Sequence, residues 1–212
     1  MKLHNGPGSP TGHTVEAVIH RLGLKVDVQL HNLFTGDLRQ AEFLALNPNA
    51  KVPVLVDGDF RLWESAAIMQ YLAMTAGDES LFPRDARSRA DIVRWQCWET
   101  TYYNSALGTL AFETVAKPRN GAGPPDSRKV DDAREQLARY APVLDQHLEG
   151  RTFLLGESLT LADYSMASLE PYPSLVPFDF SPFRNIEAYY KRMRQDASWK
   201  ATTSQPRQTA AA

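Results

Sequence analysis

The chain has 212 residues, of which 43% are hydrophobic, so it can bury the core of one large domain or of two small ones. Its 23 lysines and arginines nearly balance its 25 aspartates and glutamates, for a formal net charge of -2. This balance excludes the basic field that would hold nucleic acid or an anionic membrane surface. The first residues lack the apolar core of a signal peptide, and no window approaches the ~18 apolar residues of a membrane span. We therefore expect a cytoplasmic protein with no nucleic-acid or membrane partner.

The patterns of the first 78 residues alternate between strand and helix. In chain order they are a strand at 2–5, a helix that ends at Gly23, a strand at 25–30, a short helix at 38–47, strands at 52–56 and 60–63 joined by Asp57-Gly58-Asp59, and a helix from residue 64 with Gly77 past its end. Helices between the early strands favour parallel pairing, and the hairpin favours antiparallel pairing. The sequence predicts a β-α-β-α-β-β-α domain with a mixed four-stranded sheet over residues 1–78.

Beyond a polar, proline-marked linker at 79–85, strand patterns nearly vanish, and we predict an all-helical domain over residues 86–200. Its expected elements are a long central helix at 86–116, a helix at 128–148, a helix that begins with the capping box of Thr160 and Asp163, and a last helix from Ser181-Pro182. The single cysteine, Cys97, excludes an internal disulfide and is expected to be a small buried hydrophobe. Residues 201–212 are small and polar, which predicts a disordered tail.

A glycine- and proline-rich turn at residues 6–12 delivers Ser9 and Thr11 to the start of the first helix. Backbone amides lack partners there and the helix dipole is positive, so this position can stabilise an anion. The alternative is that one hydroxyl only caps the helix, because serine and threonine are ordinary capping residues.

Two further segments have the same ambiguity. Pro53 should stand at the start of a strand, and a cis peptide bond before it would leave the Val52 amide and carbonyl free to pair with an extended peptide. Glu64 and Ser65 begin a helix directly after a strand, so Ser65 and the first amides can bind a carboxylate while Glu64 faces an ammonium. The alternative for this pair is again a plain helix cap.

The segments GSPTGHTV, FLALNPNAKVPVLVDG, ESAAIMQYLA and LTLADYSMA, in this order, resemble the glutathione transferase family. The resemblance is specific over residues 1–75 and looser from residue 86 onward. It implies a thioredoxin-like amino-terminal domain with a cis-proline, followed by an all-helical domain. The SPTGH motif looks most like the bacterial branch related to the yeast nitrogen-regulator prion protein. That branch usually has asparagine where this chain has Thr11, which leaves both Ser9 and Thr11 as candidates for the sulfur.

The resemblance implies a binding mode for glutathione, a tripeptide with two carboxylates, an ammonium and a thiol. Ser65 and its helix would bind the γ-glutamyl carboxylate, with Glu64 near the ammonium. Val52, held by cis-Pro53, would pair with the cysteinyl backbone, and Lys51 would meet the glycine carboxylate. The co-substrate is glutathione and no metal is expected.

The expected activity follows from the same resemblance. It is a glutathione transferase that ionises the thiol and directs it at a small hydrophobic electrophile or a peroxide, as in detoxification, and that forms a homodimer. Tyr102, Tyr103 and Phe112 of the long helix are the candidates for the acceptor site, although aromatics at helical spacing also form cores. His13 is expected to cap or to face solvent, and Asp163 to be structural. The alternatives are a glutathione-dependent disulfide-bond reductase that uses two glutathiones, and a non-catalytic binding module with this fold.

Overall fold

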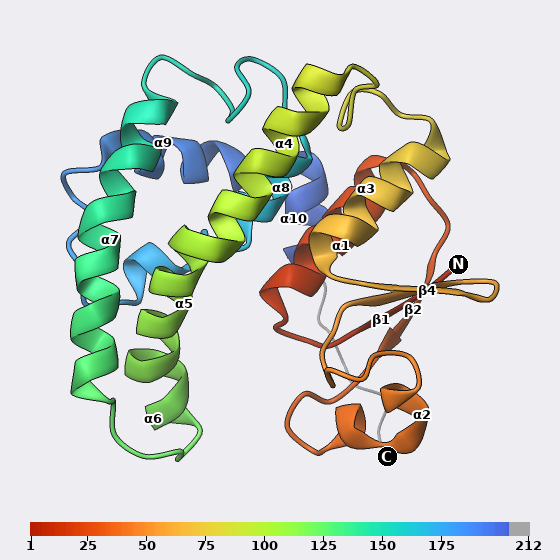
Figure 1. Ribbon diagram of the computed structural model, residues 1–212, viewed down its shortest axis with the longest axis horizontal. Helices are drawn as coiled ribbons and strands as arrows, with labels where there is room; N and C mark the ends of the chain where they lie inside the picture. The colour runs from red at the N-terminus through yellow and green to blue at the C-terminus, as the bar shows by residue number, and fades with distance from the viewer. Residues whose placement is uncertain (204–212) are drawn as a thin grey trace. The chain divides into compact units, whose positions relative to one another are not determined.

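The computed structural model describes residues 1–203. It contains two compact units, one formed by residues 1–83 with the stretch that begins at Gln195, and the other by Arg84–Arg194. The first unit holds the β-sheet and the second is built from helices (Figure 1). This arrangement confirms the predicted fold class, a thioredoxin-like domain followed by a helical one.

The elements of the first unit follow the predicted order. They are β1 Lys2–Asn5, α1 Pro10–Arg21, β2 Asp27–Leu30, the 3-10 turn η1 Asp37–Arg39, α2 Ala41–Leu44, β3 Val54–Asp57, β4 Phe60–Trp63, α3 Ser65–Ala76 and, far along the chain, α10 Ala197–Thr203. The short helix predicted at 38–47 is divided into η1 and α2, because Gln40 between them is extended, with φ -67° and ψ 148°.

The sheet has the strand order β2-β1-β3-β4. The β1–β2 pair is parallel, whereas β1–β3 and β3–β4 are antiparallel. The parallel pair is connected through α1, and the β3–β4 hairpin closes at Gly58, whose φ of 61° suits glycine in a tight turn. The predicted mixed sheet is confirmed.

Side chains alternate along β1 between two layers of this unit. Leu3 is fully buried and Asn5 donates a hydrogen bond to Glu16 of α1, so these residues face α1. His4 lies instead against Phe43 of α2, with ring centroids 6.3 Å apart. Figure 1 shows α1 and α3 next to each other and α2 apart from them. The sheet therefore separates the α1/α3 layer from α2.

The carboxyl-terminal helix α10 packs on α1, and this differs from the predicted domain boundaries. We expected residues up to 200 in the helical domain and a tail from 201. In the structure, residues 195–203 group with the first unit, and α10 continues to Thr203. Trp199 is buried and its ring lies against that of His13 at a centroid distance of 3.8 Å, a contact with α1 that the sequence pattern around residue 199 did not indicate. Residues 204–212 of the predicted tail lie outside the described part of the chain.

The second unit consists of helices and helical turns. They are α4 Ala86–Trp98, the π-helical turn η2 Glu99–Tyr103, α5 Asn104–Ala111, the π-helical turn η3 Phe112–Ala116, α6 Lys117–Arg119, α7 Ser127–Leu148, α8 Leu161–Ala167, the 3-10 turn η4 Tyr172–Ser174 and α9 Arg184–Met193. The long helix predicted at 86–116 thus exists and runs three residues further, with two π-helical turns within it. The last predicted helix begins at Arg184 rather than at Ser181.

The expectation for Cys97 was wrong, because its side chain is exposed. The buried side of α4 is formed by Ile92, Trp95 and Gln96 and continues to Glu99. These positions follow the i, i+3, i+4, i+7 spacing of one helix face, and residue 97 falls outside it. The helix is therefore amphipathic here rather than apolar all round.

The predicted capping box at the start of α8 is confirmed. The Oδ2 atom of Asp163 accepts hydrogen bonds from the Thr160 amide at 2.8 Å and from its hydroxyl at 2.9 Å. Its Oδ1 atom accepts from the Leu154 amide at 2.9 Å and from the Tyr189 hydroxyl at 3.1 Å. Burial raises the pKa of Asp163, and these four donors oppose that shift. Asp163 therefore joins α8, α9 and the preceding loop.

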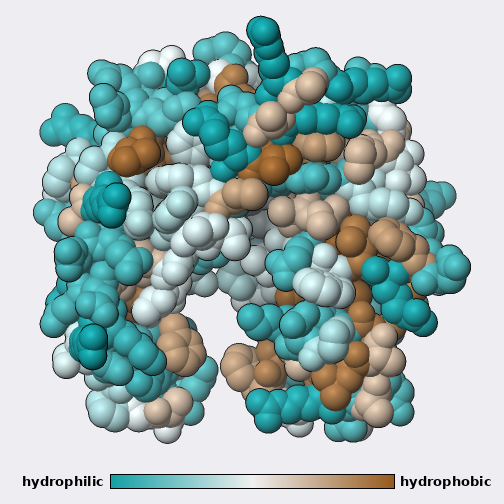
Figure 2. Space-filling model, in the orientation of Figure 1, coloured by the Kyte–Doolittle hydropathy of each residue, from teal (hydrophilic) through white to brown (hydrophobic). Residues whose placement is uncertain are grey.

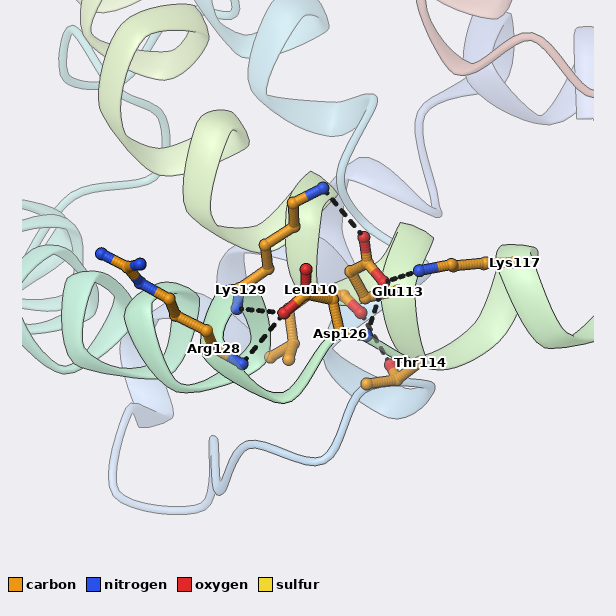
Figure 3. A network of polar contacts seen from close by, with 7 residues as sticks. All are labelled: Leu110, Glu113, Thr114, Lys117, Asp126, Arg128 and Lys129. Atoms are coloured by element: carbon orange, nitrogen blue, oxygen red, sulfur yellow. Dashed lines mark hydrogen bonds and ion pairs between the residues drawn. The ribbon is translucent and has the colours of Figure 1, made fainter. Parts of the chain in front are cut away.

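A second buried carboxylate, Glu113, connects the end of the long helix to the start of α7 (Figure 3). Its Oε2 atom accepts from Lys117 Nζ at 2.8 Å and from the Asp126 amide at 2.9 Å, and Lys129 Nζ lies 3.7 Å from Oε1. The hydrogen bond from Lys117 is the main reason that the pKa of Glu113 is lowered. Asp126 in turn caps α7 by accepting from the amides of Arg128 and Lys129. The loop between the two helices is thus held at both ends by carboxylates.

Exposed hydrophobic side chains occur at several separate places among hydrophilic ones in Figure 2. No helix within residues 1–203 is long and apolar enough to cross a membrane.

Candidate active site

Three segments of the first unit meet at one edge of the sheet. His4 of β1 pairs with Val54 of β3, which pairs with Trp63 of β4. One step further along each strand places Asn5, Pro53 and Glu64 opposite one another. Because neighbouring strands lie ~4.8 Å apart, the turn after β1, the loop before β3 and the start of α3 are adjacent. The predicted site residues Ser9, Val52 and Ser65 belong to these three segments.

Ser9 is the N-cap of α1, so its hydroxyl has the capping role that was the alternative interpretation. Its Oγ accepts a hydrogen bond from the Gly12 amide at 3.1 Å, which leaves the hydroxyl proton free to be donated. Pro10 has no N–H, and the amide of Thr11 has no acceptor among residues 1–203. The start of α1 therefore combines two donors, a hydroxyl and an amide, at the positive end of a helix dipole.

The glycines of the opening turn have separate structural reasons. Gly8 has φ +80°, a conformation that side chains disfavour. At Gly6 a Cβ atom would lie 2.3 Å from Leu33 Cδ2, so the turn after β1 packs closely on the loop after β2. These two constraints direct the chain from β1 into Ser9.

The peptide bond between Val52 and Pro53 is cis, as the resemblance implied. Val52 is half-buried, and its amide and carbonyl make no hydrogen bond within the described part of the chain. The exposed ammonium of Lys51 likewise has no ion pair there. This segment can therefore pair with an extended peptide and with a carboxylate.

Asn47 positions this loop, and the sequence analysis missed it. The residue is only 3% exposed. Its Nδ2 donates to the Lys51 carbonyl at 2.8 Å, and its Oδ1 accepts from the Asn49 amide at 3.0 Å. The sequence analysis placed Asn47 only at the end of a predicted short helix, yet asparagine side chains in turns often hydrogen-bond to nearby backbone groups.

Glu64 has a strained backbone at the third segment. Its φ of 73° is rare for a residue other than glycine and costs about 1 to 3 kcal/mol. It is the N-cap of α3 but its side chain caps no amide, so the exposed carboxylate is available to another group. The amides of Ser65, Ala66 and Ala67 have no acceptor among residues 1–203. Such a helix start binds carboxylates well.

The three acceptor-site candidates differ in exposure. Tyr102 is 45% exposed and Phe112 53%, whereas Tyr103 is fully buried in the second unit. Burial also raises the pKa of Tyr103. Tyr103 is therefore a core residue and not a lining residue, because its ring packs on that of Trp98 with centroids 5.7 Å apart. Phe34, which the sequence analysis passed over, is 79% exposed and follows Leu33, the residue packed on the turn at Gly6.

His13 contacts the carboxyl-terminal helix. Its Nε2 shares a hydrogen bond of 2.7 Å with the Thr202 hydroxyl. This replaces the expected capping or solvent-facing role. No group of three or more His, Cys, Asp or Glu side chains among the described residues could hold a metal ion.

Comparison with known proteins identifies the family. The family model of the glutathione S-transferase N-terminal domain matches residues 1–74, and that of the C-terminal domain matches residues 103–196. The chain belongs to the glutathione S-transferase family. It is 36% identical to glutathione S-transferase 3 of Zea mays over 179 residues, which cover 84% of this chain and 80% of the relative. The chain is accordingly a glutathione S-transferase enzyme.

Solved structures of the family have the same fold. Glutathione transferase F7 from Populus trichocarpa superposes with a TM-score of 0.86 at 25% identity, covering 95% of this chain and 97% of that one. Glutathione transferase URE2P6 from Phanerochaete chrysosporium, in complex with oxidized glutathione, has a TM-score of 0.83 at 22% identity and covers 95% of this chain and 94% of that one. The latter likeness shows the fold alone, so the resemblance to the prion-related branch stays a prediction.

Proposed function

We propose that the chain binds glutathione along the sheet edge of its first unit and directs the ionised thiol at a small hydrophobic electrophile. The observation that carries this proposal is the convergence of the α1 start, the unpaired Val52 backbone and the α3 start. An extended tripeptide needs a backbone partner in the middle and charged partners at its ends. The loop before β3 offers the Val52 backbone and the Lys51 ammonium, the start of α3 offers Glu64 and its free amides, and the start of α1 remains for the thiol.

The charged ends of glutathione have separate partners in this proposal. Ser65 and the free amides of α3 bind the γ-glutamyl carboxylate, and Glu64 faces the ammonium. Val52, next to cis-Pro53, pairs with the cysteinyl backbone. Lys51 meets the glycine carboxylate, and Asn47 holds the loop in place for both contacts.

The sulfur then lies at the start of α1. A thiol with an unperturbed pKa of ~8.5 needs ~2.7 kcal/mol of preferential thiolate stabilisation to lower that pKa by two units. A hydroxyl hydrogen bond to a charged group supplies ~1.5 to 3 kcal/mol, and helix-end amides add ~0.3 to 1 kcal/mol. We propose Ser9 as the hydroxyl donor and the Thr11 amide as the second donor. No general base is required.

Conjugation proceeds by attack of the thiolate on the electrophile. With a chlorinated aromatic acceptor the C–S bond forms, the C–Cl bond breaks and chloride leaves, while the thiol proton has already passed to water. Tyr102 and Phe112, the two exposed acceptor-site candidates, supply aromatic surface for such an acceptor. A peroxide is the other acceptor class for the same thiolate.

Glutathione-dependent disulfide reduction is the second candidate. The URE2P6 structure is a complex with oxidized glutathione, and disulfide reduction with two glutathiones needs no cysteine of the protein. A non-catalytic module is disfavoured, because the donors at Ser9, Val52 and Ser65 are all retained. We also propose a homodimer in the cytoplasm, as is usual in the family.

One experiment separates these functions. The purified chain is applied to immobilised glutathione, eluted, and assayed with a chlorinated dinitrobenzene, with an organic hydroperoxide and with hydroxyethyl disulfide. Turnover of the chlorinated dinitrobenzene or of the hydroperoxide supports the proposal. Turnover of the disulfide alone supports the reductase, and retention without any turnover would leave only a binding module.

A further inference from the structure

Two histidines of the first unit, His4 of β1 and His31 just after β2, share a hydrogen bond. His4 Nδ1 and His31 Nε2 are 2.9 Å apart, and the ring planes differ by 24°. The two nitrogens therefore face each other with room for one proton. One must donate and the other accept, so the bond exists when at most one ring is charged and is lost when both are imidazolium.

The surroundings keep the pair neutral near pH 7. Burial is the main reason that the pKa of His4 is lowered, and the neighbouring His31 lowers it further. Burial also lowers the pKa of His31. Lys2 of β1 and Asp27 of β2 act electrostatically on His4, and Asp37 of η1 acts on His31. Asp37 and Glu42 of α2 also line, with both rings, a cleft of about 250 Å³. The carboxylates of Asp27 and Asp37 oppose the shifts without reversing them.

Phe43 links the histidine pair to the loop before β3. Its buried ring meets both imidazoles edge-on, at 4.9 Å from His31 and 6.3 Å from His4. The Phe43 carbonyl accepts from the Asn47 amide at 2.9 Å, and Asn47 holds the Lys51 carbonyl at 2.8 Å. A continuous series of contacts thus runs from the two rings through α2 to the segment that carries Lys51 and Val52.

We propose that the His4–His31 hydrogen bond is a positioning contact for glutathione, which seats α2 through Phe43 and is lost, with part of the glutathione affinity, when both rings are protonated. This inference rests on the proposed function, because it concerns the same binding segments. Neither histidine touches the tripeptide. The pair acts through α2 and Asn47.

Calorimetric titration with S-methylglutathione tests the inference, since this ligand has no thiol to ionise between about pH 5 and pH 8. A net hydrogen bond of ordinary strength corresponds to about a threefold to tenfold change in affinity. We expect the wild-type dissociation constant to rise by that factor as the pH falls from neutral to a value at which both rings are protonated. Thermal unfolding at each pH verifies that the chain stays folded.

Two variants of one residue separate positioning from a general effect of acid. H31Q places an amide near the position of Nε2, so it keeps a hydrogen bond to His4 but does not titrate. H31L removes the bond at similar volume. We expect H31Q to bind S-methylglutathione with neutral-pH affinity throughout, and H31L to bind about threefold to tenfold more weakly at every pH. The matched control is H20Q, at an exposed position of α1, which should keep the wild-type profile.

The possible outcomes distinguish the positioning role of the histidine pair from the proposed function. A wild-type affinity that is independent of pH, or an H31Q profile equal to that of wild type, would overturn the positioning role and leave the proposed function intact. Absence of S-methylglutathione binding at all pH values would overturn both.

Discussion

Replacement of Ser9 by alanine tests the proposed site at the atom nearest the sulfur. The hydroxyl has two roles, as acceptor from the Gly12 amide at 3.1 Å and as proposed donor to the thiolate. Loss of the cap costs about 1 kcal/mol of folding free energy. Loss of a hydrogen bond to a charged sulfur costs ~1.5 to 3 kcal/mol, which raises the pKa of bound glutathione by about one to two units.

The thiolate absorbance of bound glutathione, followed against pH, measures this pKa shift. Thermal unfolding measures the stability that the cap contributes. Glycine at position 9 separates the two roles, because it is a nearly equal N-cap without a hydroxyl. S9A and S9G should raise the thiol pKa equally, whereas only S9A should lower the melting temperature appreciably. T11V, which keeps the Thr11 amide, should change neither. If S9G leaves the thiol pKa unchanged and T11V raises it, Thr11 is the donor, and if neither moves it, the sulfur does not lie at the start of α1.

Three further predictions concern residues around the site and the core. E64G should relieve ~1 to 3 kcal/mol of backbone strain in the folded state, and the greater entropy of the unfolded chain should offset ~0.4 to 1 kcal/mol of this. Calorimetry should therefore find a more stable protein that binds glutathione more weakly. E64A should lose the binding without gaining stability. N47A should lower the free energy of unfolding by ~1 to 3 kcal/mol and raise the KM for glutathione. An unchanged KM would refute the role of Asn47 in positioning the loop. Burial raises the pKa of Glu99 from its ordinary value of 4.5 to about 7, so the folded state holds a proton that the unfolded state releases. Stability from this residue is therefore present at about pH 4.5 and is lost as the pH rises to about 7, by up to about 3 kcal/mol. E99Q should then melt higher than wild type at alkaline pH only, and equal melting curves there would contradict this assignment.

Local signals in the sequence were sufficient for much of the fold. Gly58 and Gly77 lie where the tight turn and the end of α3 need positive φ, and both positions were predicted from short-range chemistry. The capping box of Thr160 and Asp163 is likewise a contact across three residues. Such features depend on neighbours in the chain, so a single sequence contains them.

The site was identified only in part, for the same reason. Ser9, Pro53 and Ser65 were predicted because each marks a helix start or a strand start, and the family resemblance connected them. Asn47 was missed because its function is to hold the carbonyl of Lys51, a contact that becomes visible only when the loop has folded.

By itself, the sequence determined the order of strands and helices, the turns and the helix caps, because these follow from periodicity and from interactions within a few residues. Tertiary structure alone decided that Cys97 is exposed and Tyr103 buried, that α10 returns to pack on α1, and that His4 meets His31 across 27 positions of the chain. Packing between distant segments sets these outcomes, and helical spacing cannot tell which neighbour will cover a given face.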